Sequence, residues 1–509
     1  MILPSPQKKT GFLDRLTRRI TGRGEPVILA SEYDYAGTVF SHAAIIPHLA
    51  NLMNAQPRSF SFVSSHRSPL TKVYKSIGIP RALGQNHSAK HLAHAEKWAR
   101  QALPRLRSRQ ELLDLELEDF PLGMVIYDTY MRAHCLPTVD LTDERLMKAA
   151  VEAAAILYAT IDYFDTHTVS AVFPDHFVYN YAGILAQYAW RRDIPVFIYS
   201  FAKQFYLYRI PARRKAQPRL EVPYQHTFDQ YPEDFALLDN QEQRLEKARL
   251  AIDEHLNGRK TDLIFGGHSA YGAPGTARRL GPAKRPRIVI MLHDFCDAPH
   301  VYGKFLFPDF VEWMDYLLDR AAHTDFEWII KPHPNLQDQS RAQLVKTNNS
   351  VVEDLKRRYP HVTFIDPQYS NHHLIEDGVK ALFTVRGSAG HELAYLGIPV
   401  VNAGPNPHMR YGFNFHAQNL AEYDEYIANA DRLKVGGSKG EIEEFYYMRY
   451  FSMQDRFAAD FTPVPADKKT ERPTIDLMRQ WEAEYGRAIR EPARRYVEEA
   501  YKTQVCASP

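Results

Sequence analysis

The chain contains little cysteine: three residues in 509, Cys135, Cys296 and Cys506, all far apart. This spacing excludes a disulfide framework and is typical of a protein from a reducing cytosol. CxxC and DxD signatures are also absent, so we expect neither a metal nor any other required cofactor. No apolar run reaches the ~18 residues that span a bilayer, and no apolar h-region follows the N-terminus, which argues against a spanning helix and a secretory signal.

An excess of charge of one sign is lacking as well, because 63 basic and 61 acidic residues leave a net charge of only +2. Without a global basic field, no nucleic-acid partner is expected. Apolar residues make up 45% of the chain and charged residues 24%, which is ordinary for a globular protein, and the length allows more than one domain. The composition therefore predicts a cytoplasmic, multidomain globular protein.

Positive charge does gather in residues 1–24, which we interpret as a basic amphipathic tail. Its basic residues are Lys8, Lys9, Arg15, Arg18, Arg19 and Arg23, and its apolar ones are Phe12, Leu13, Leu16 and Ile20. A helix of this kind lies peripherally on an anionic membrane surface, here the inner face of the cytoplasmic membrane. A solvated tail is the alternative.

The rest of the chain alternates strand-like and helix-like segments, which predicts βαβ units and parallel sheets. Strands are expected at 26–33, 60–63, 169–173, 195–199, 287–292, 326–330, 362–366, 380–385 and 398–402. Helices are expected at 42–53, 87–106, 146–163, 179–191, 440–457 and 474–502. Glycine and proline punctuate 258–286, a predicted linker between two α/β domains, 25–257 and 287–435. The predicted fold is α/β, with two doubly wound domains facing across a cleft and a helical segment, 436–509, packed back on them.

The segment 383–400 reads as a buried strand, a glycine turn, a helix and a second buried strand. The turn consists of Arg386, Gly387, Ser388, Ala389 and Gly390. Glycines let the backbone approach a ligand closely, and the first N–H groups of a helix favour a phosphate. Glu392, one turn further on, is placed to accept hydrogen bonds from a sugar hydroxyl. A tight crossover without a ligand is the alternative.

A second loop, KPHPN, occupies residues 331–335 directly after a predicted strand. In open α/β sheets, ligands bind where strands end and loops begin. Lys331 supplies a point charge suited to phosphate, and His333, held between two prolines, is placed to give a proton to a departing phosphate. A structural histidine in a proline turn is the alternative. After the neighbouring strand 287–292 come His293 and Asp297, which we expect at the same edge, unless the aspartate caps a helix.

Further candidates lie in the first domain and after the last strand of the second domain. Asp128 is a candidate base and Arg132 a candidate substrate contact. They lie four residues apart, on one face if the segment is helical, and a surface ion pair is the alternative. The carboxylate of Asp175 beside the imidazole of His176 suits a general base, and Asp34 occupies the corresponding place after the first strand. Simple turns are the alternative for both. After the last strand, His408, Arg410 and Tyr411 are candidates for contact with the sugar or base of a nucleotide donor.

Two such domains, with a nucleotide on the second, resemble GT-B glycosyltransferases. Glu392 lies five residues before the glycine of Gly397-Ile-Pro-Val400, as does a ribose-binding glutamate in the retaining branch of that group. The KPHP loop resembles the HP motif of bacterial sialyltransferases and Kdo transferases, which implies that His333 meets the donor phosphate. The turn 387–390 departs from the paired serines of sialyltransferases, so a CMP-linked and a UDP-linked donor both remain open.

A closer likeness runs through 123–132, 293–303, 307–310, Trp313, the KPHPN loop, the glycine turn and 406–411. These segments look like bacterial capsule and surface-carbohydrate biosynthesis proteins, and the likeness covers most of 121–425. It implies transfer of a sugar from a nucleotide-sugar, bound by the second domain, to a glycan or glycolipid acceptor on the first. The alternatives are transfer of a polyol phosphate from a CDP-linked donor, and a non-catalytic scaffold that binds nucleotide or glycan.

Overall fold

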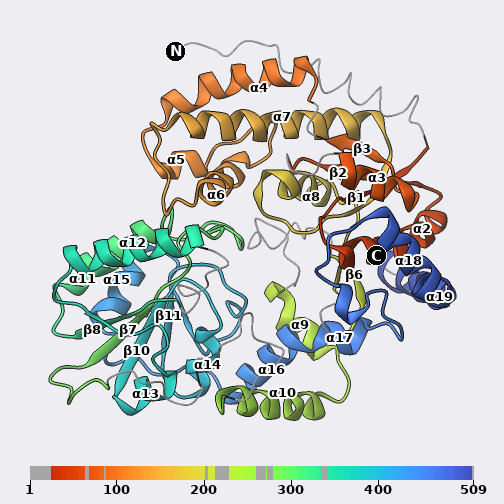
Figure 1. Ribbon diagram of the computed structural model, residues 1–509. Coiled ribbons are helices and arrows are strands. Elements are labelled where there is room, and N and C mark those ends of the chain that lie inside the picture. The colour runs from red at the N-terminus through yellow and green to blue at the C-terminus, as the bar shows by residue number, and fades with distance from the viewer. Residues whose placement is uncertain are drawn as a thin grey trace, which may run out of the picture.

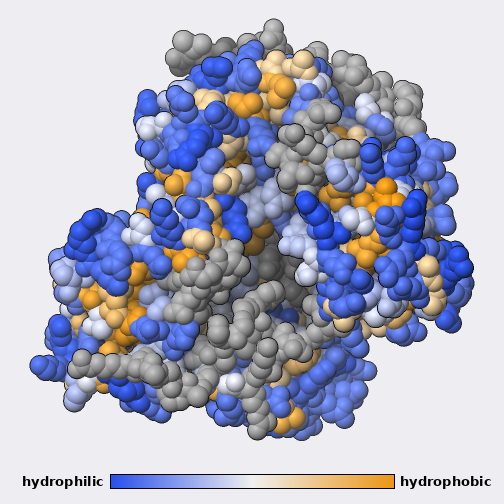
Figure 2. Space-filling model, in the orientation of Figure 1, coloured by the Kyte–Doolittle hydropathy of each residue, from blue (hydrophilic) through white to orange (hydrophobic). Residues whose placement is uncertain are grey.

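The computed structural model describes residues 25–63, 68–84, 87–200, 204–211, 228–258, 271, 279–333 and 342–506. The basic tail 1–24, Pro334 and Asn335 of the KPHPN loop, and most of the predicted linker lie outside these ranges. The described residues form two α/β domains, the first in the upper half of the view and the second at the lower left (Figure 1). A space-filling view shows the surface hollowed between them (Figure 2).

The first domain is built on a six-stranded sheet with the order β3-β2-β1-β4-β5-β6. The strands are β1 (Val27–Ser31), β2 (Gln56–Ser61), β3 (Arg81–Gly84), β4 (Val169–Phe173), β5 (Val196–Ser200) and β6 (Tyr206–Ile210). All pairs are parallel except β5 with β6. β1 is buried along its whole length, as expected for a strand covered on both faces. The strand order reverses between β1 and β4, which makes this the topological switch point of the sheet, so ligands are expected at the carboxyl ends of these two parallel strands.

Helices cover both faces of this sheet. They are α2 (Ala36–Leu52), α3 (Ser68–Ser76), α4 (Ala89–Ala102), α5 (Arg109–Leu113), α6 (Leu122–His134), α7 (Glu144–Thr166) and α8 (Ile184–Trp190), with a π-helical turn, η2 (Tyr179–Gly183), before α8. α4 and α7 lie side by side at the top of the molecule (Figure 1). Alanines make this close approach possible, for example Ala95 and Ala99 on α4 and Ala153 on α7, all fully buried.

The second domain repeats the same strand order, β12-β11-β10-β7-β8-β9, in an all-parallel sheet. Its strands are β7 (Arg287–Met291), β8 (Glu327–Lys331), β9 (Thr363–Phe364), β10 (Val379–Thr384), β11 (Val400–Asn402) and β12 (Phe415–His416). Its helices are α11 (Phe310–Ala321), α12 (Ala342–Arg358), α13 (Asn371–Glu376), α14 (Ala389–Tyr395) and α15 (Leu420–Ala428). Two doubly wound domains of the GT-B type, predicted from the sequence, are thus confirmed. The edge strands β3, β6 and β12 were not predicted.

The chain crosses between the domains twice among the described residues. It leaves the first domain through α9 (Tyr231–Ala236) and α10 (Gln241–Leu256), and returns through α16 (Lys439–Tyr450) and α17 (Ser452–Phe457). α18 (Ile475–Trp481) and α19 (Arg487–Tyr501) then pack on the first domain, where α19 contacts α2 and Trp481 stacks on Phe40 with ring centroids 5.2 Å apart. None of the described helices has the length and apolar content that a membrane crossing requires.

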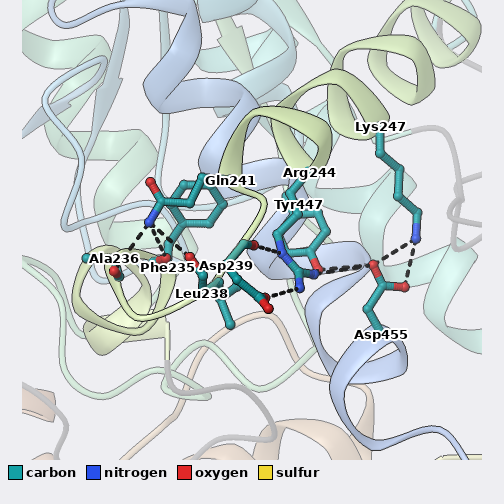
Figure 3. A network of polar contacts seen from close by, with 9 residues as sticks. All are labelled: Phe235, Ala236, Leu238, Asp239, Gln241, Arg244, Lys247, Tyr447 and Asp455. Atoms are coloured by element: carbon teal, nitrogen blue, oxygen red, sulfur yellow. Dashed lines mark hydrogen bonds and ion pairs between the residues drawn. The ribbon is translucent and has the colours of Figure 1, made fainter.

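A polar network holds the two crossings together (Figure 3). Lys247 Nζ on α10 lies 2.7 Å from Asp455 Oδ1 on α17, and Tyr447 Oη on α16 donates to Asp455 Oδ2 at 3.0 Å. Arg244, also on α10, bonds to Tyr447. In the same view Gln241 donates to three backbone carbonyls at the end of α9. The outgoing and returning segments therefore form one unit beside the second domain.

Candidate functional site

A cavity of about 350 Å³ lies at the carboxyl edge of the second sheet, where β7, β8 and β10 end. Those strands are followed by His293, His333 and the turn that begins at Arg386, and all three residues line the cavity. The edge between β7 and β10 is the topological switch point of this sheet. The crossing helices close the cavity from the other side, with His255 on α10 and with Phe445, Tyr446, Arg449 and Tyr450 on α16.

The two glycines of the turn have different reasons to be glycine. Gly387 has φ +135°, a conformation that favours glycine, and a side chain there would meet only His293, at 3.8 Å. A Cβ on Gly390 would lie 2.4 Å from Nε2 of the buried His408. The prediction that both glycines open the backbone to a ligand stays a prediction, and at Gly390 the missing side chain also makes room for the imidazole of His408. Among the described residues, the N–H groups of Ser388 and Ala389 have no acceptor.

His293 is held as a neutral imidazole. Its Nε2 accepts hydrogen bonds from the backbone N–H groups of Val385 and Arg386, at 3.3 and 3.2 Å, so its proton is on Nδ1. The ring stacks on Phe310 with centroids 4.8 Å apart. Burial, together with the positive charge of Arg386, keeps the pKa of His293 well below its usual range. His293 can therefore give a hydrogen bond into the cavity without carrying a charge.

Arg386 lines the cavity, but its guanidinium is held by contacts with the protein around the cavity. Its guanidinium donates to the backbone carbonyls of Asp297 and Ala298, both at 3.0 Å. It also lies over the rings of Tyr302 and Phe310, 5.5 Å from each centroid. The carboxylate of Asp297 points to the first domain, where Tyr179 Oη donates to it at 3.2 Å.

Glu392 lines the cavity and is ionised. His255 Nε2 lies 3.2 Å from Oε1, and Tyr271 Oη donates to Oε2 at 3.0 Å. Burial raises the pKa of this carboxyl. The hydrogen bond from His255, the charges of His391 and His255 when these are protonated, and a hydrogen bond from Ser388 together outweigh burial and lower the pKa to about 2. Both oxygens thus have protein partners, and each retains a lone pair for a ligand. The predicted contact with a ribose stays a prediction.

His391 was not predicted from the sequence. It is 3% exposed, lines the cavity, and neither ring nitrogen has a hydrogen-bond partner among the described residues. Burial lowers its pKa to about 4, so the ring is neutral and can both donate and accept. Buried polar atoms without partners are costly unless a ligand or water satisfies them. Its place next to Glu392 on α14 was the available signal, whereas nothing local pointed to His255 or the aromatic residues of α16.

Several predicted binding residues lie outside this cavity. Lys331 is buried, donates to Asn371 Oδ1 at 2.6 Å, and is not among the lining residues. Burial lowers its pKa to about 8, although the carboxylate of Glu392 opposes the change. Arg410 bonds to the carbonyl of Asp229 and to Glu233 beside α9, and Tyr411 Oη donates to Glu444 at 3.0 Å. The guanidinium of Arg410 and the hydroxyl of Tyr411 are therefore both engaged by other residues of the protein. His408 does line the cavity.

In the first domain, Asp175 lies at the switch point between β1 and β4. Ser31 Oγ, at the end of β1, donates to its Oδ1 at 3.1 Å. Its Oδ2 is buried without a hydrogen-bond partner in the described chain, 3.7 Å from His176 Nε2. His176 is itself engaged, with Nε2 2.8 Å from Tyr181 Oη. Burial and the charge of Asp175 raise the pKa of Tyr33 to about 12, so that hydroxyl stays protonated.

The other two candidate bases have different partners. Asp34 forms an exposed ion pair with Arg472 of the C-terminal segment at 3.1 Å. Asp128 is 2% exposed, and its Oδ1 lies 2.7 Å from Nδ1 of His300 in the second domain. The helix α6 does form, and the alternative considered for Asp128 and Arg132, a surface ion pair between them, is not observed, because Arg132 points to Asp297 at 3.9 Å. Asp128 is therefore closed to an acceptor, whereas Asp34 is a partly exposed surface carboxylate paired through Oδ2.

No protein-family model and no curated sequence matches the chain. Among solved structures, it is similar to a glycosyltransferase from Rickettsia africae, with 11% identity over 96% of this chain and 100% of the other, at a TM-score of 0.23. It is also similar to a UDP-GlcNAc 2-epimerase from Neisseria meningitidis bound to UDP-GlcNAc (11% identity, 90% and 99% covered, TM-score 0.22). A third is the wall teichoic acid polymerase TagF (12% identity, 96% and 93% covered, TM-score 0.19). TM-scores this low establish no relationship, so the fold assignment rests on the two strand orders.

Proposed function

We propose that this protein is a glycosyltransferase that moves a sugar from a nucleotide-sugar to a surface glycan or glycolipid. The observation that carries the proposal is the cavity at the switch point of the second sheet. It combines an ionised carboxylate, Glu392, with the neutral imidazoles of His293 and His391. The sequence resemblance to surface-carbohydrate proteins supports the choice of acceptor class.

The charges of the cavity favour one orientation of the donor. A phosphate is repelled by the carboxylate of Glu392 and attracted to His293 Nδ1–H and to the N–H groups of Ser388 and Ala389, which have no acceptor among the described residues. Donors fixed in advance around a departing phosphate stabilise the charge that develops there. His333, on the neighbouring strand end, is the proposed proton donor. Glu392 is then left to accept hydrogen bonds from a ribose hydroxyl.

Asp175 is the proposed base that accepts the proton of the acceptor hydroxyl. Among the four candidates in the first domain, it alone combines a position at a switch point with a buried carboxylate oxygen that has no hydrogen-bond partner among the described residues. Asp34 and Asp128 are occupied by other contacts, and His176 is hydrogen-bonded through Nε2. No metal is required by this scheme.

Thermal stabilisation by UDP, CMP and CDP, followed by hydrolysis of the matching nucleotide-sugars, tests the proposal. We expect one nucleotide to raise the melting temperature and its sugar derivative to be turned over. His333→Ala should lower that turnover by about 10²–10⁴. His361→Ala, an exposed histidine of the same domain, is the matched control and should behave as wild type. Nucleotide binding without turnover, even with a lipid-linked acceptor, contradicts the proposal and favours a scaffold.

A further inference from the structure

The loop 294–303 lies between the first domain and the candidate donor site. On one side, its carbonyls at Asp297, Ala298 and Pro299 accept hydrogen bonds from Arg386, at 3.0, 3.0 and 3.4 Å. Arg386 directly precedes Gly387, and its own N–H is bonded to His293. The shape of this loop therefore fixes where the glycine turn and His293 lie.

On its other side, the loop is held by a buried pair from the first domain. His300 is 2% exposed and Asp128 is 2% exposed. The pair is bonded twice: Nδ1 of His300 lies 2.7 Å from Asp128 Oδ1, and the backbone N–H of His300 donates to Oδ2 at 3.3 Å. The same carboxylate thus fixes both the side chain and the backbone of the loop residue, and no solvent competes for it.

We propose that Asp128 is a positioning residue for the donor site, not the base. Through His300 it fixes the loop 294–303, and the carbonyls of that loop fix Arg386 and the turn 386–389. This inference rests on the proposed function only in calling the cavity a donor site. The mechanical link runs through hydrogen bonds between described residues and stands without a substrate.

Hydrogen–deuterium exchange of the full chain, without ligand, tests the link directly. Asp128→Ala should speed amide exchange about tenfold or more in peptides that cover 294–303 and 385–389. Asp128→Asn can keep both contacts, because its oxygen can accept from the backbone N–H of His300 while its NH₂ group donates to Nδ1 of the other imidazole tautomer. It should therefore stay closer to wild type, and it keeps the test valid if the alanine variant does not fold. Tyr127→Phe is the matched control: it removes a buried hydrogen bond of 2.6 Å from the same helix to Asp309, outside the loop. It should leave both peptides unchanged.

Binding and turnover provide the second arm, with UDP and CMP as probes. Asp128→Ala should weaken nucleotide binding about tenfold or more, while Asp128→Asn keeps most of it and shows the wild-type dependence of turnover on pH. The inference is overturned if exchange at 385–389 is unchanged in Asp128→Ala. It is also overturned if Asp128→Asn exchanges normally but loses turnover by about 10²–10⁴, as a base would. If neither nucleotide binds the wild type, the proposed function fails and the exchange arm still decides the link.

Discussion

Glu392→Gln gives the sharpest test of the electrostatics of the cavity. The carboxylate is buried and receives hydrogen bonds from His255 and Tyr271. Its pKa is lowered from 4.5 to about 2, which corresponds to a stabilisation on the order of 3 kcal/mol. Glutamine has one carbonyl oxygen, so its NH₂ group must face one of the two donors. We therefore expect Glu392→Gln to lower the free energy of unfolding by about 1.5–3 kcal/mol at pH 7.

Urea denaturation at several pH values, followed by circular dichroism, measures this effect. The folded pKa is depressed, so the stabilisation is present above the unfolded pKa near 4.5 and is lost as the pH falls towards 2. The difference in stability between wild type and Glu392→Gln should therefore shrink over that range. A variant as stable as wild type at pH 7, with the same dependence on pH, would refute the assignment of an ionised, hydrogen-bonded carboxylate.

Tyr271→Phe separates the hydrogen bond from the charge. It removes one donor and keeps the carboxylate, and should cost about 1.5–3 kcal/mol because the acceptor is charged. The double variant should lose less than the sum of the two single losses, since each removes part of the same interaction. If the losses of stability in the two single variants simply add, Tyr271 and Glu392 do not stabilise each other and this carboxylate has a different stabilising partner.

Three further predictions concern other positions. Gly390→Ala should lower stability by about 1–3 kcal/mol in urea melts, because its Cβ would overlap the buried ring of His408; a neutral result would mean that the ring can move away. Asp175→Asn should lower turnover of the identified donor and acceptor by about 10²–10⁴ while the fold stays intact, whereas Asp34→Asn should change turnover little. Equal effects of the two substitutions would show that Asp175 is not the base. The pKa of Lys331 is about 8 in the folded protein against 10.5 in the unfolded chain. As the pH rises from 8 to 10.5, the free energy of unfolding of the wild type should therefore increase relative to that of Lys331→Met. The same pH dependence of stability in both proteins would contradict a buried ammonium group.

The sequence by itself determined the two sheets and the edge at which the site lies. Buried parallel strands are continuous apolar runs, such as 287–292, and glycine or proline marks where they end, so these signals are local. Since ligands collect at strand ends in such sheets, His293, His333 and Glu392 could be placed at the cavity before the structure was known. β3 and β12 were missed because strands of four and two residues carry little periodic pattern, and β6 was missed because it pairs antiparallel with β5, outside the βαβ alternation.

Only the tertiary structure decided what each of these groups can do. Glu392 takes its partners from α10 and from Tyr271, more than a hundred residues away, and Asp128 meets His300 across 172 positions. Such pairs leave no trace in local spacing, because hydrogen-bond geometry is set by packing of whole domains. The same holds for Gly390, where the absence of a side chain makes room for the buried ring of His408. A residue type shows which chemistry is available at a position, whereas its buried neighbours determine whether that chemistry is free to act on a substrate.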